Sequence, residues 1–376
     1  MATEIQVKVT IVGAGPAGLG CAALLKKMGI ATHDMLVLDA NMVGSSFEKW
    51  PQQMRMITPS FPCNGYHQTD LNAITPDSSP GFSLGVEHPS GAEYAQYLRN
   101  IVKQYDIDVW ENTTVETVST DFDHSFMIQT KSDENIHTQY LIWAGGEFPA
   151  PRKKGFSGSE LCLHNSDINS WDECGDEEYI VIGCYESGVD AAYHLAQRGK
   201  QVTIVDENSA QLDTYDPSLV LSPYTSERLA SLNSSGLVNL LQGFKVQTIT
   251  KTSQGYQIES ESGQTLTTKS IPINCTGFDI NFGPTEHMFE RDKDGFPTLN
   301  NFDESTLHRN LFLAGPKLKH GNVLLCFIYK FRGRFATPCR VIGDELELDT
   351  SILDQYRMAG MLLDDLTCCE EQECIC

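Results

Sequence analysis

The sequence predicts an α/β protein in which a second strand–turn–helix unit is inserted into a first one. Three observations lead to this prediction. An apolar, β-branched run at residues 7–12 stops at a glycine turn and is followed by an apolar helical pattern. The same order of features returns from residue 178 onward. A last apolar strand with its own glycine turn, at residues 310–316, then follows the second unit.

The first glycine turn has the residue pattern of a dinucleotide-binding site. Gly13 permits a tight turn, Gly15 lets the backbone approach a pyrophosphate, and Gly18 allows helix and strand to pack closely. A second apolar strand over residues 35–38 ends in Asp39, at the distance of about twenty residues where an acid accepts a ribose hydroxyl. These features predict a nucleotide at the N-terminus of the helix, and a glycine-rich structural turn is the alternative.

The rest of the first unit is predicted as an irregular segment, a helix and a β-meander. Residues 41–89 are rich in Pro, Gly, Ser and aromatic residues, and a segment of this length inside a domain is usually functional. Ser90 is a suitable N-cap for a helix over residues 92–104. A short strand at 107–110 and three further strands follow, and the last of them ends at Gly145.

The second unit repeats this order. An apolar strand at 178–182 enters a turn at Gly183, a helical pattern ends at Gly199, and the next strand ends in Asp206. The later strands match the meander of the first unit one by one, and the repeat closes at Gly277. Because chance hardly produces such a series in order, we predict two Rossmann-like nucleotide-binding domains, each with a β-meander.

The position of the last strand sets the predicted domain limits. This strand and a helix over residues 324–340 are expected to complete the sheet of the first unit. The first domain would then comprise residues 1–150 and 278–350, and the second domain would comprise residues 151–277. Residues 351–376 are expected to form an acidic, cysteine-rich C-terminal tail.

The composition limits the classes of partner. The formal net charge of -23 argues against nucleic acid or an anionic membrane as a main partner. Apolar runs of about eighteen residues are absent from the sequence, so no membrane span is expected. The first residues lack the pattern of a signal peptide. Eight of the twelve cysteines are scattered singly, as in a reduced protein, which predicts a cytoplasmic location.

These motifs resemble those of the two-dinucleotide-binding-domain flavoproteins, in which the first glycine motif holds FAD and the second holds NAD(P)H. The resemblance covers nearly all of residues 7–343. The bacillithiol-disulfide and thioredoxin reductase branch is similar in length, in the first glycine motif and in the strand that ends at Gly315. The flavin-containing monooxygenase branch is similar at residues 50–51, 54–59 and 143–151. The resemblance also implies a homodimer.

The resemblance further implies which residues hold the two cofactors. Those expected at FAD are Gly13, Ala14, Gly15, Pro16, Ala17, Gly18, Asp39, Ala40, Ser46, Trp50, Thr58, Gly145, Gly315 and Pro316. Those expected at NAD(P)H are Gly183, Cys184, Tyr185, Glu186, Ser187, Gly188, Asp206 and Gly277. Within the first set, the resemblance places Ser46, Trp50 and Thr58 near the isoalloxazine, together with the turn at Gly315-Pro316.

Three positions bear on how well the chain matches this family. Tyr185 stands where a middle glycine is common in the second motif, and it would crowd a pyrophosphate if it turned inward. Pro316 stands where many relatives carry an aspartate for the ribityl chain. Asp206 favours a ribose diol and repels a 2′-phosphate, and no arginine pair follows it. The sequence therefore favours NADH over NADPH.

The electron acceptor is the open question, because a flavin takes a hydride from nicotinamide and passes electrons on. No Cys-x-x-Cys motif occurs, and Ala17 stands where a bacillithiol-type reductase carries a cysteine. Four cysteines gather in the last nine residues as Cys368, Cys369, Cys374 and Cys376. They are candidates for an electron relay or for a soft-metal site that takes Zn(II), Cu(I) or Hg(II). Incidental cysteines in a disordered tail are the alternative.

Other candidate residues are given structural interpretations. Cys184 in the second glycine turn and Cys326 in an apolar run are interpreted as packing residues. His320, with Lys317 and Lys319, follows the turn on the flavin side. These three residues are interpreted as a solvated loop, with stabilisation of a reduced anionic flavin as the alternative.

Three functions remain in competition. The leading one is an FAD-dependent NAD(P)H oxidoreductase that passes electrons to a small-molecule, thiol/disulfide or metal-linked acceptor, with the tail cysteines as relay. The second is a flavin-dependent monooxygenase. The linker motif of aromatic residues and histidine that is typical of that family is matched only loosely, by Phe156, His164 and Trp171. The third is a flavin-containing metal-binding or redox-sensing protein.

Overall fold

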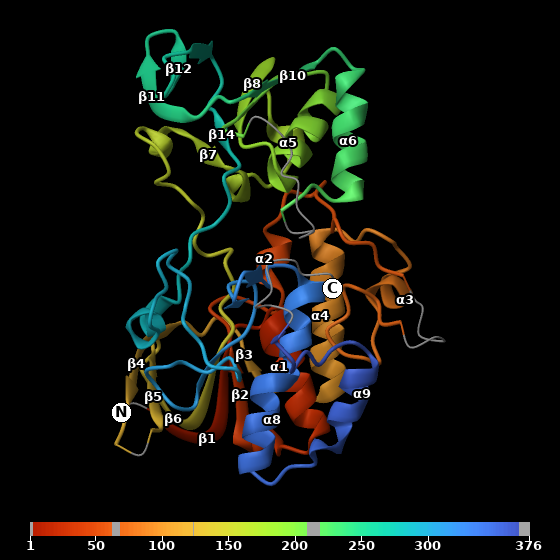
Figure 1. Cartoon of the computed structure of the whole chain (residues 1–376), viewed down its shortest axis with the longest axis vertical. Coiled ribbons are helices and arrows are strands. Elements are labelled where there is room, and N and C mark those ends of the chain that lie inside the picture. Colours follow the sequence, from red (N-terminus) through yellow and green to blue (C-terminus); the bar gives the residue numbers. More distant parts are fainter. Residues whose placement is uncertain (1–2, 62–67, 123, 209–218, 368–376) are drawn as a thin grey trace. The chain divides into compact units, whose positions relative to one another are not determined.

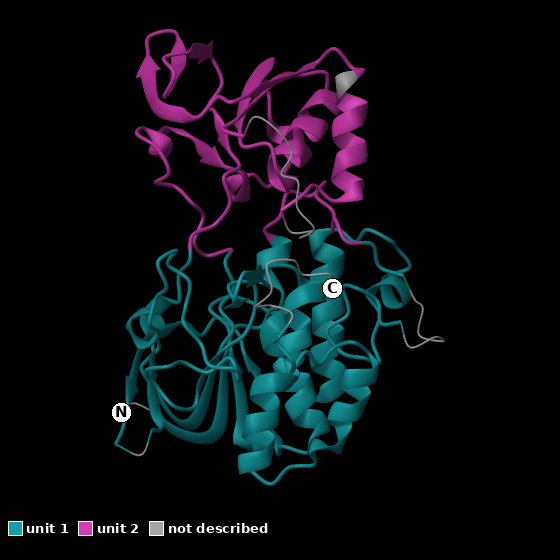
Figure 2. Cartoon of the chain, viewed as in Figure 1, with its two compact units in different colours: residues 1–48, 59–147, 280–376 teal, residues 49–58, 148–279 magenta. Residues whose placement is uncertain are grey.

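The computed structural model describes residues 3–61, 68–122, 124–208 and 219–367. Contacts within the chain divide it into two compact units, which Figure 2 shows in separate colours. Unit 1 comprises residues 1–48, 59–147 and 280–376, and unit 2 comprises residues 49–58 and 148–279. No helix in the described ranges is long and apolar enough to cross a membrane.

Unit 1 is built on a parallel sheet (Figure 1). In it β1 (Thr3–Val12) lies between β2 (Met35–Leu38) and β6 (Glu134–Trp143). Parallel pairing extends to β3 (Val109–Trp110) beside β2 and to β15 (Leu311–Leu313) beside β6. Strands β2 and β15 are buried along their whole length, as expected for parallel strands that are covered on both faces.

Strand β6 also belongs to the meander of unit 1. Its first half pairs antiparallel with β5 (Phe126–Thr130), which in turn pairs with β4 (Val115–Thr120). Its second half pairs in parallel with β15, over residues 141–143. The last strand therefore returns to the first unit, as the sequence predicts.

Four helices cover one side of this sheet (Figure 1). They are α1 (Pro16–Lys27), α4 (Gly91–Tyr105), α8 (Ala336–Glu345) and α9 (Leu353–Met358). Helix α1 contacts both α4 and α8. A capping box between Ser90 and Glu93 starts α4, which confirms the predicted helix and its N-cap.

The C-terminal part of unit 1 differs from the prediction in two ways. The single helix predicted over residues 324–340 is wrong. The chain instead forms β17 (Val323–Leu324), α7 (Ile328–Phe331), a 3-10 turn (Arg332–Arg334) and α8. The reason is that the Arg332 and Arg334 side chains are buried and reach backbone or acidic partners in other segments. In addition, Leu353 and Tyr356 of α9 are buried, so residues 353–358 are folded and not part of a free tail.

Several short elements complete unit 1. They are η1 (Thr32–Asp34), α2 (Ser45–Glu48), α3 (Pro80–Leu84), η6 (Gly283–Met288), β16 (Lys319–His320) and η8 (Thr350–Ile352). Strands β16 and β17 form an antiparallel hairpin directly after the turn at Gly315. This hairpin is therefore positioned by the carboxyl end of β15.

Unit 2 has a parallel sheet of its own, with the order β10-β9-β8-β14-β7. These strands are β10 (Val238–Gln242), β9 (Gln201–Asp206), β8 (Glu178–Ile182), β14 (Ile273–Asn274) and β7 (Leu163–His164). Helices α5 (Glu186–Gln197) and α6 (Pro223–Asn233) contact each other, and α5 also contacts β8 and β9. Short 3-10 turns lie at Ser159–Leu161, Asn165–Asp167 and Trp171–Glu173.

The meander of unit 2 forms a separate sheet of β11 (Val246–Thr252), β12 (Gly255–Ser260) and β13 (Thr265–Thr268). The sequence predicts that the last strand before Gly277 matches the last strand of the first meander. This is wrong, because β13 takes that place in the meander and β14 joins the parallel sheet. Pro272 stands between β13 and β14, where a missing N–H interrupts a strand ladder. In unit 1 the equivalent strand, β6, is continuous.

The segment 49–58 belongs to unit 2, although the sequence assigned it to the first domain. The Gln52 N–H donates to the Asn169 carbonyl at 2.9 Å. The Gln53 amide donates to Ser170 Oγ at 2.9 Å and accepts from the Trp171 N–H at 3.0 Å. These bonds attach the segment to the residues that precede β8.

Candidate functional site

The first glycine turn joins β1 to α1 at the carboxyl edge of the unit 1 sheet. Gly13 has a φ of 113°, and a Cβ atom there would lie 2.2 Å from the carbonyl oxygen of Ala144. A Cβ atom on Gly18 would lie 1.9 Å from the carbonyl oxygen of Gly13. Since both contacts are with backbone, neither position accepts a side chain without moving the turn or the helix.

Gly15 lies in a different environment. A Cβ atom there would meet nothing within 4 Å, so the backbone borders open space. Gly15 is the N-cap of α1, which has no side-chain cap and no acidic residue in its first turn. Pro16 has no N–H, and the next N–H groups of the helix lack intrahelical partners beside this space. The turn thus has the room, the donors and the dipole that a pyrophosphate requires.

Asp39 is tied to the same turn. Its Oδ2 accepts the Ala14 N–H at 2.8 Å and its Oδ1 accepts the Asn41 N–H at 2.8 Å. These bonds fix the carboxylate at the end of β2, beside the glycines. A carboxylate oxygen can accept more than one hydrogen bond, so this geometry suits a ribose hydroxyl as a further donor.

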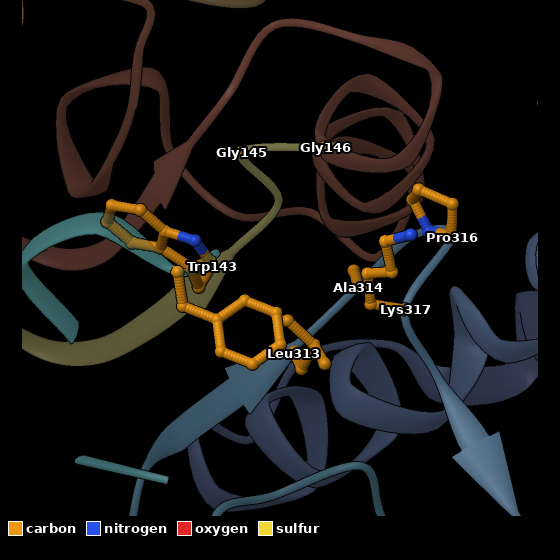
Figure 3. A pocket seen from close by; sticks show the side chains of 8 residues that line it. Trp143, Gly145, Gly146, Leu313, Ala314, Pro316 and Lys317 are labelled. Atoms are coloured by element: carbon orange, nitrogen blue, oxygen red, sulfur yellow. The ribbon is translucent and has the colours of Figure 1, made fainter. Parts of the chain in front are cut away.

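The carboxyl ends of β6 and β15 lie at the same edge. The Ala144 N–H donates to the Val12 carbonyl at 2.8 Å, and the Ala314 N–H donates to the Trp143 carbonyl at 2.9 Å. A small hollow opens here, and Figure 3 shows its lining. It is lined by Trp143, Gly145, Gly146, Phe282, Leu313, Ala314, Pro316 and Lys317. Three of the predicted FAD residues, Gly145, Gly315 and Pro316, are therefore brought together at one edge of the sheet.

The other predicted flavin-side residues are divided between the units. The Gly44 N–H donates to the Ala14 carbonyl at 3.1 Å, which places the start of α2, and with it Ser46, beside the first glycine turn. Ala40 is exposed next to Asp39. Trp50 and Thr58 belong to unit 2. Their place at the isoalloxazine stays a prediction.

The second glycine turn repeats the first one bond for bond. Gly183 has a φ of 100°, and a Cβ atom on Gly188 would lie 1.9 Å from the Gly183 carbonyl oxygen. Asp206 at the end of β9 accepts the Cys184 N–H at 2.6 Å and the Asn208 N–H at 2.8 Å. The two units therefore share the tight turn, the close helix–strand approach and the acid that braces the turn.

Two side chains distinguish the second turn from the first. Tyr185 replaces the middle glycine as the N-cap of α5, and its hydroxyl donates to the Val220 carbonyl at 2.9 Å. Glu186, the first residue of α5, accepts the Ser222 N–H at 2.6 Å. Both side chains thus contact the segment that leads into α6. Ser187 and Gly188 complete the first turn of α5, and Gly277 follows β14 with its carbonyl 3.0 Å from His164 Nε2.

Cys162 and Cys184 do not show the features of reactive thiols. Burial, and then the charge of Asp206, raise the pKa of Cys184 to about 11. Burial raises the pKa of Cys162 to about 12. Both thiols are therefore protonated at neutral pH, which agrees with Cys184 as a packing residue.

Among the residues that the structure describes, no group of three or more His, Cys, Asp and Glu side chains could hold a metal ion. Cys368, Cys369, Cys374 and Cys376 lie outside the described residues.

The interpretation of His320 as part of a solvated loop is wrong. The His320 ring Nε2 lies 2.6 Å from Asp303 Oδ1, and the Asp303 side chain is fully buried. Arg334 holds the same carboxylate through Nε at 2.9 Å and Nη2 at 2.8 Å. The sequence could not indicate this buried triad, because its members come from a turn, a hairpin and a 3-10 helix.

We expect Arg334→Met to lower the free energy of unfolding by about 3–5 kcal/mol, because it leaves the Asp303 charge buried without its main partner. The change in the free energy of unfolding is measured from the urea midpoint and slope of the purified protein. Arg309→Met is the matched control. Its ion pair with Glu345 spans 3.0 Å at the surface, and its loss is expected to cost less than about 1 kcal/mol. Equal effects of the two substitutions would contradict a stabilising role for the triad.

Comparison with known proteins adds the wider context. Residues 10–315 match the family described as pyridine nucleotide-disulphide oxidoreductase. Bacilliredoxin reductase Bdr of Bacillus subtilis (strain 168) is 27% identical over 339 residues, which cover 88% of this chain and 95% of the relative.

Solved structures agree with the fold. The bacillithiol disulfide reductase Bdr (YpdA) from Staphylococcus aureus superposes with a TM-score of 0.74 at 20% identity, over 91% of this chain and 99% of that chain. A flavin-containing monooxygenase from Stenotrophomonas maltophilia superposes with a TM-score of 0.70 at 16% identity, again over 91% and 99%. The predicted fold class, with two nucleotide-binding domains of Rossmann type, is thereby confirmed.

Proposed function

We propose that this chain, which belongs to the pyridine nucleotide-disulphide oxidoreductase family and is an FAD-dependent NAD(P)H oxidoreductase, takes its electrons from NADH and delivers them to a thiol/disulfide acceptor. The observation that carries the proposal is the pair of glycine turns, each braced by a strand-end acid. Asp39 braces the turn of unit 1 and Asp206 braces the turn of unit 2. Two nucleotide sites in one chain suit a donor and a resident cofactor.

We assign FAD to unit 1. The open space at Gly15 and the uncapped start of α1 fit its pyrophosphate, and the Asp39 carboxylate fits its ribose. The hollow between Gly145 and Pro316 borders the same edge of the sheet. Lys317 forms an ion pair with Glu147 at 2.7 Å there and so holds the turns after β15 and β6 together. When bound, the flavin accepts a hydride and passes electrons on, while the chain supplies binding and orientation.

We assign the nicotinamide dinucleotide to unit 2, with NADH preferred. Asp206 is fixed by two backbone N–H groups and accepts the ribose diol. Glu207 and Asn208 follow it, so the described residues directly after the strand add negative charge and no cation. A 2′-phosphate would be repelled by the two neighbouring carboxylates.

The acceptor is assigned by likeness to the relative whose name is bacilliredoxin reductase. The first turn supplies no thiol for such a reaction, since Ala17 occupies the position where a relative of this type would carry one. Thiol–disulfide exchange requires a thiolate that can approach its partner. We therefore propose the four tail cysteines as the relay between the flavin and an outside disulfide.

Anaerobic absorbance spectroscopy tests the assignment of donor and cofactor. NADH is expected to bleach the flavin of the purified protein faster than NADPH does at equal concentration. A disulfide such as 5,5′-dithiobis(2-nitrobenzoic acid) is then expected to restore the oxidised spectrum. Purified protein without a yellow chromophore, or a flavin that no reduced nicotinamide bleaches, would overturn the proposed function.

Removal of residues 368–376 tests the relay. Turnover with the disulfide is expected to fall by about tenfold or more, which corresponds to a barrier increase of about 1.4 kcal/mol. Reduction of the flavin by NADH, measured without acceptor, is expected to stay unchanged. A full-length variant with serine at the four cysteine positions keeps the acidic residues and is the matched control. If either variant turns over the disulfide as well as the natural chain, the tail is not the relay.

A flavin-dependent monooxygenase is the second candidate, and the missing thiol at Ala17 is the observation that favours it. The two candidates differ in what consumes the electrons. An oxygen electrode, together with mass spectrometry of offered soft nucleophiles, separates them. Oxygen uptake matched by an oxygenated product would favour the monooxygenase, whereas anaerobic turnover with a disulfide would exclude it as the main activity.

A further inference from the structure

An acidic residue begins the second nucleotide-binding helix, where the first helix has none. Helix α1 begins with Pro16 and has no acid in its first turn. Helix α5 begins with Glu186, which holds the corresponding place after the middle residue of the glycine turn. A carboxylate at a helix N-terminus is itself stabilised by the helix dipole. The second helix therefore carries its own anion.

This carboxylate is held by the start of a second helix. The Ser222 N–H donates to Glu186 Oε1 at 2.6 Å, and the Ser222 hydroxyl donates to Oε2 at 3.1 Å. The Thr225 hydroxyl also donates to Oε2. Ser222 is the N-cap of α6, so the N-termini of α5 and α6 meet at one carboxylate. The Tyr185 hydroxyl fastens the same segment through the Val220 carbonyl.

No described cation neutralises Glu186. Arg228, which lies one turn after Thr225 on α6, pairs with Asp190 at 2.7 Å. Asp190 lies one turn after Glu186 on α5. The two acids have different partners, because hydroxyl and amide donors hold Glu186 whereas a guanidinium holds Asp190. The charge of Glu186 consequently remains at the end of α5 that a dinucleotide pyrophosphate approaches.

We propose that Glu186, which Ser222 and Thr225 hold beside the N-terminus of α5, sets the affinity and charge selectivity of the second site by repelling the pyrophosphate there. The proposal rests on the assignment of the nicotinamide dinucleotide to unit 2. The carboxylate lowers the affinity for any dinucleotide at this turn. It therefore keeps the site weak, so that the spent dinucleotide leaves readily, and it adds to the repulsion of more negatively charged nucleotides.

Glu186→Gln tests the proposal, because it keeps the size and hydrogen-bonding atoms of the side chain but removes its charge. Isothermal titration of the oxidised holoenzyme with NAD⁺ is expected to show a dissociation constant about tenfold lower than that of the natural chain. A factor of this size lies between the repulsion of two like charges in water and their repulsion at a protein surface. The gain is expected to shrink at high salt, which screens charges. A dissociation constant that is unchanged or raised would overturn the proposal.

Two control variants separate charge from structure. Glu259→Gln removes an exposed charge from β12 of the same unit and is expected to leave the NAD⁺ affinity unchanged within about twofold. Glu186→Asp keeps the charge and shortens the reach, and it is expected to bind no more tightly than the natural chain. If the Gln and Asp variants weaken binding equally, Glu186 acts only by bracing α6 and the proposal fails.

The proposed function can fail separately from this inference. If NADH does not bleach the flavin of the natural protein and NAD⁺ binds to neither form, the assignment of unit 2 is wrong. If NADH bleaches the flavin normally and Glu186→Gln binds NAD⁺ no more tightly, only the role of Glu186 is refuted.

Discussion

Gly18→Val is expected to yield protein that retains almost no flavin. A Cβ atom at this position would lie 1.9 Å from the Gly13 carbonyl oxygen, so α1 must move away from β1 or the turn must change shape. Either movement displaces the N–H groups that would hold the pyrophosphate. Forced overpacking of this kind costs about 3 kcal/mol or more, which is over about 100-fold in a dissociation constant. The flavin absorbance per protein after gel filtration measures the loss.

The repeat provides a matched control for this substitution. Gly188→Val creates the same contact in unit 2, 1.9 Å from the Gly183 carbonyl oxygen. The protein is expected to keep its flavin but to lose reduction by NADH. Loss of flavin from the Gly188 variant alone would mean that the two cofactors are assigned to the wrong units.

Both glycine turns were predictable because the signals that define them are local. Each turn needs a β-branched strand, glycines where a Cβ atom would meet backbone, and an acid at the end of the next strand. The structure places Asp39 and Asp206 in hydrogen bonds to their turns, at the strand ends that the sequence indicates. The fold class followed from the repetition of these signals, and it is confirmed.

Features that depend on distant partners were not predictable. The segment 49–58 has no periodicity, and its anchor from Gln53 to Ser170 joins residues 117 positions apart. The contact of Glu186 with Ser222 spans 36 positions. Nothing near Glu186 in the sequence shows that its side chain turns toward α6. Such tertiary contacts, rather than local propensity, decide how the second turn differs from the first.

The interrupted C-terminal helix has a similar explanation. Residues 324–340 have a mixed apolar and basic pattern, which indicates a helix with a mixed surface. Arg334 is instead fully buried against Asp303, and Arg332 donates to the Ala73 carbonyl at 3.0 Å. Both arginines lie in the 3-10 turn between α7 and α8, and their side chains are held by segments distant in the sequence.

Asp206→Asn is expected to lower kcat/KM for NADH by about 10- to 200-fold. This factor corresponds to the loss of about 1.5–3 kcal/mol, which is the usual contribution of a hydrogen bond to a charged group. The natural carboxylate accepts from the Cys184 and Asn208 N–H groups, and the ribose diol would be a further donor. An amide can place an oxygen toward only one of these groups, and its NH₂ then faces a donor. NADPH is expected to lose less, because the repulsion of its 2′-phosphate is relieved at the same time. The ratio of kcat/KM values for NADH and NADPH therefore falls toward one.

Asp39→Asn is the control that gives this result its meaning. Asp39 accepts from the Ala14 and Asn41 N–H groups in the same geometry, so the substitution creates the same donor conflict in unit 1. It is expected to weaken retention of the flavin while the ratio of kcat/KM values for NADH and NADPH, measured with flavin added back, stays as in the natural chain. If Asp39→Asn changes that ratio and Asp206→Asn does not, the nicotinamide nucleotide binds to unit 1. If the natural chain uses NADPH more efficiently than NADH, the two carboxylates at 206 and 207 do not govern the choice, and cations elsewhere in the chain must.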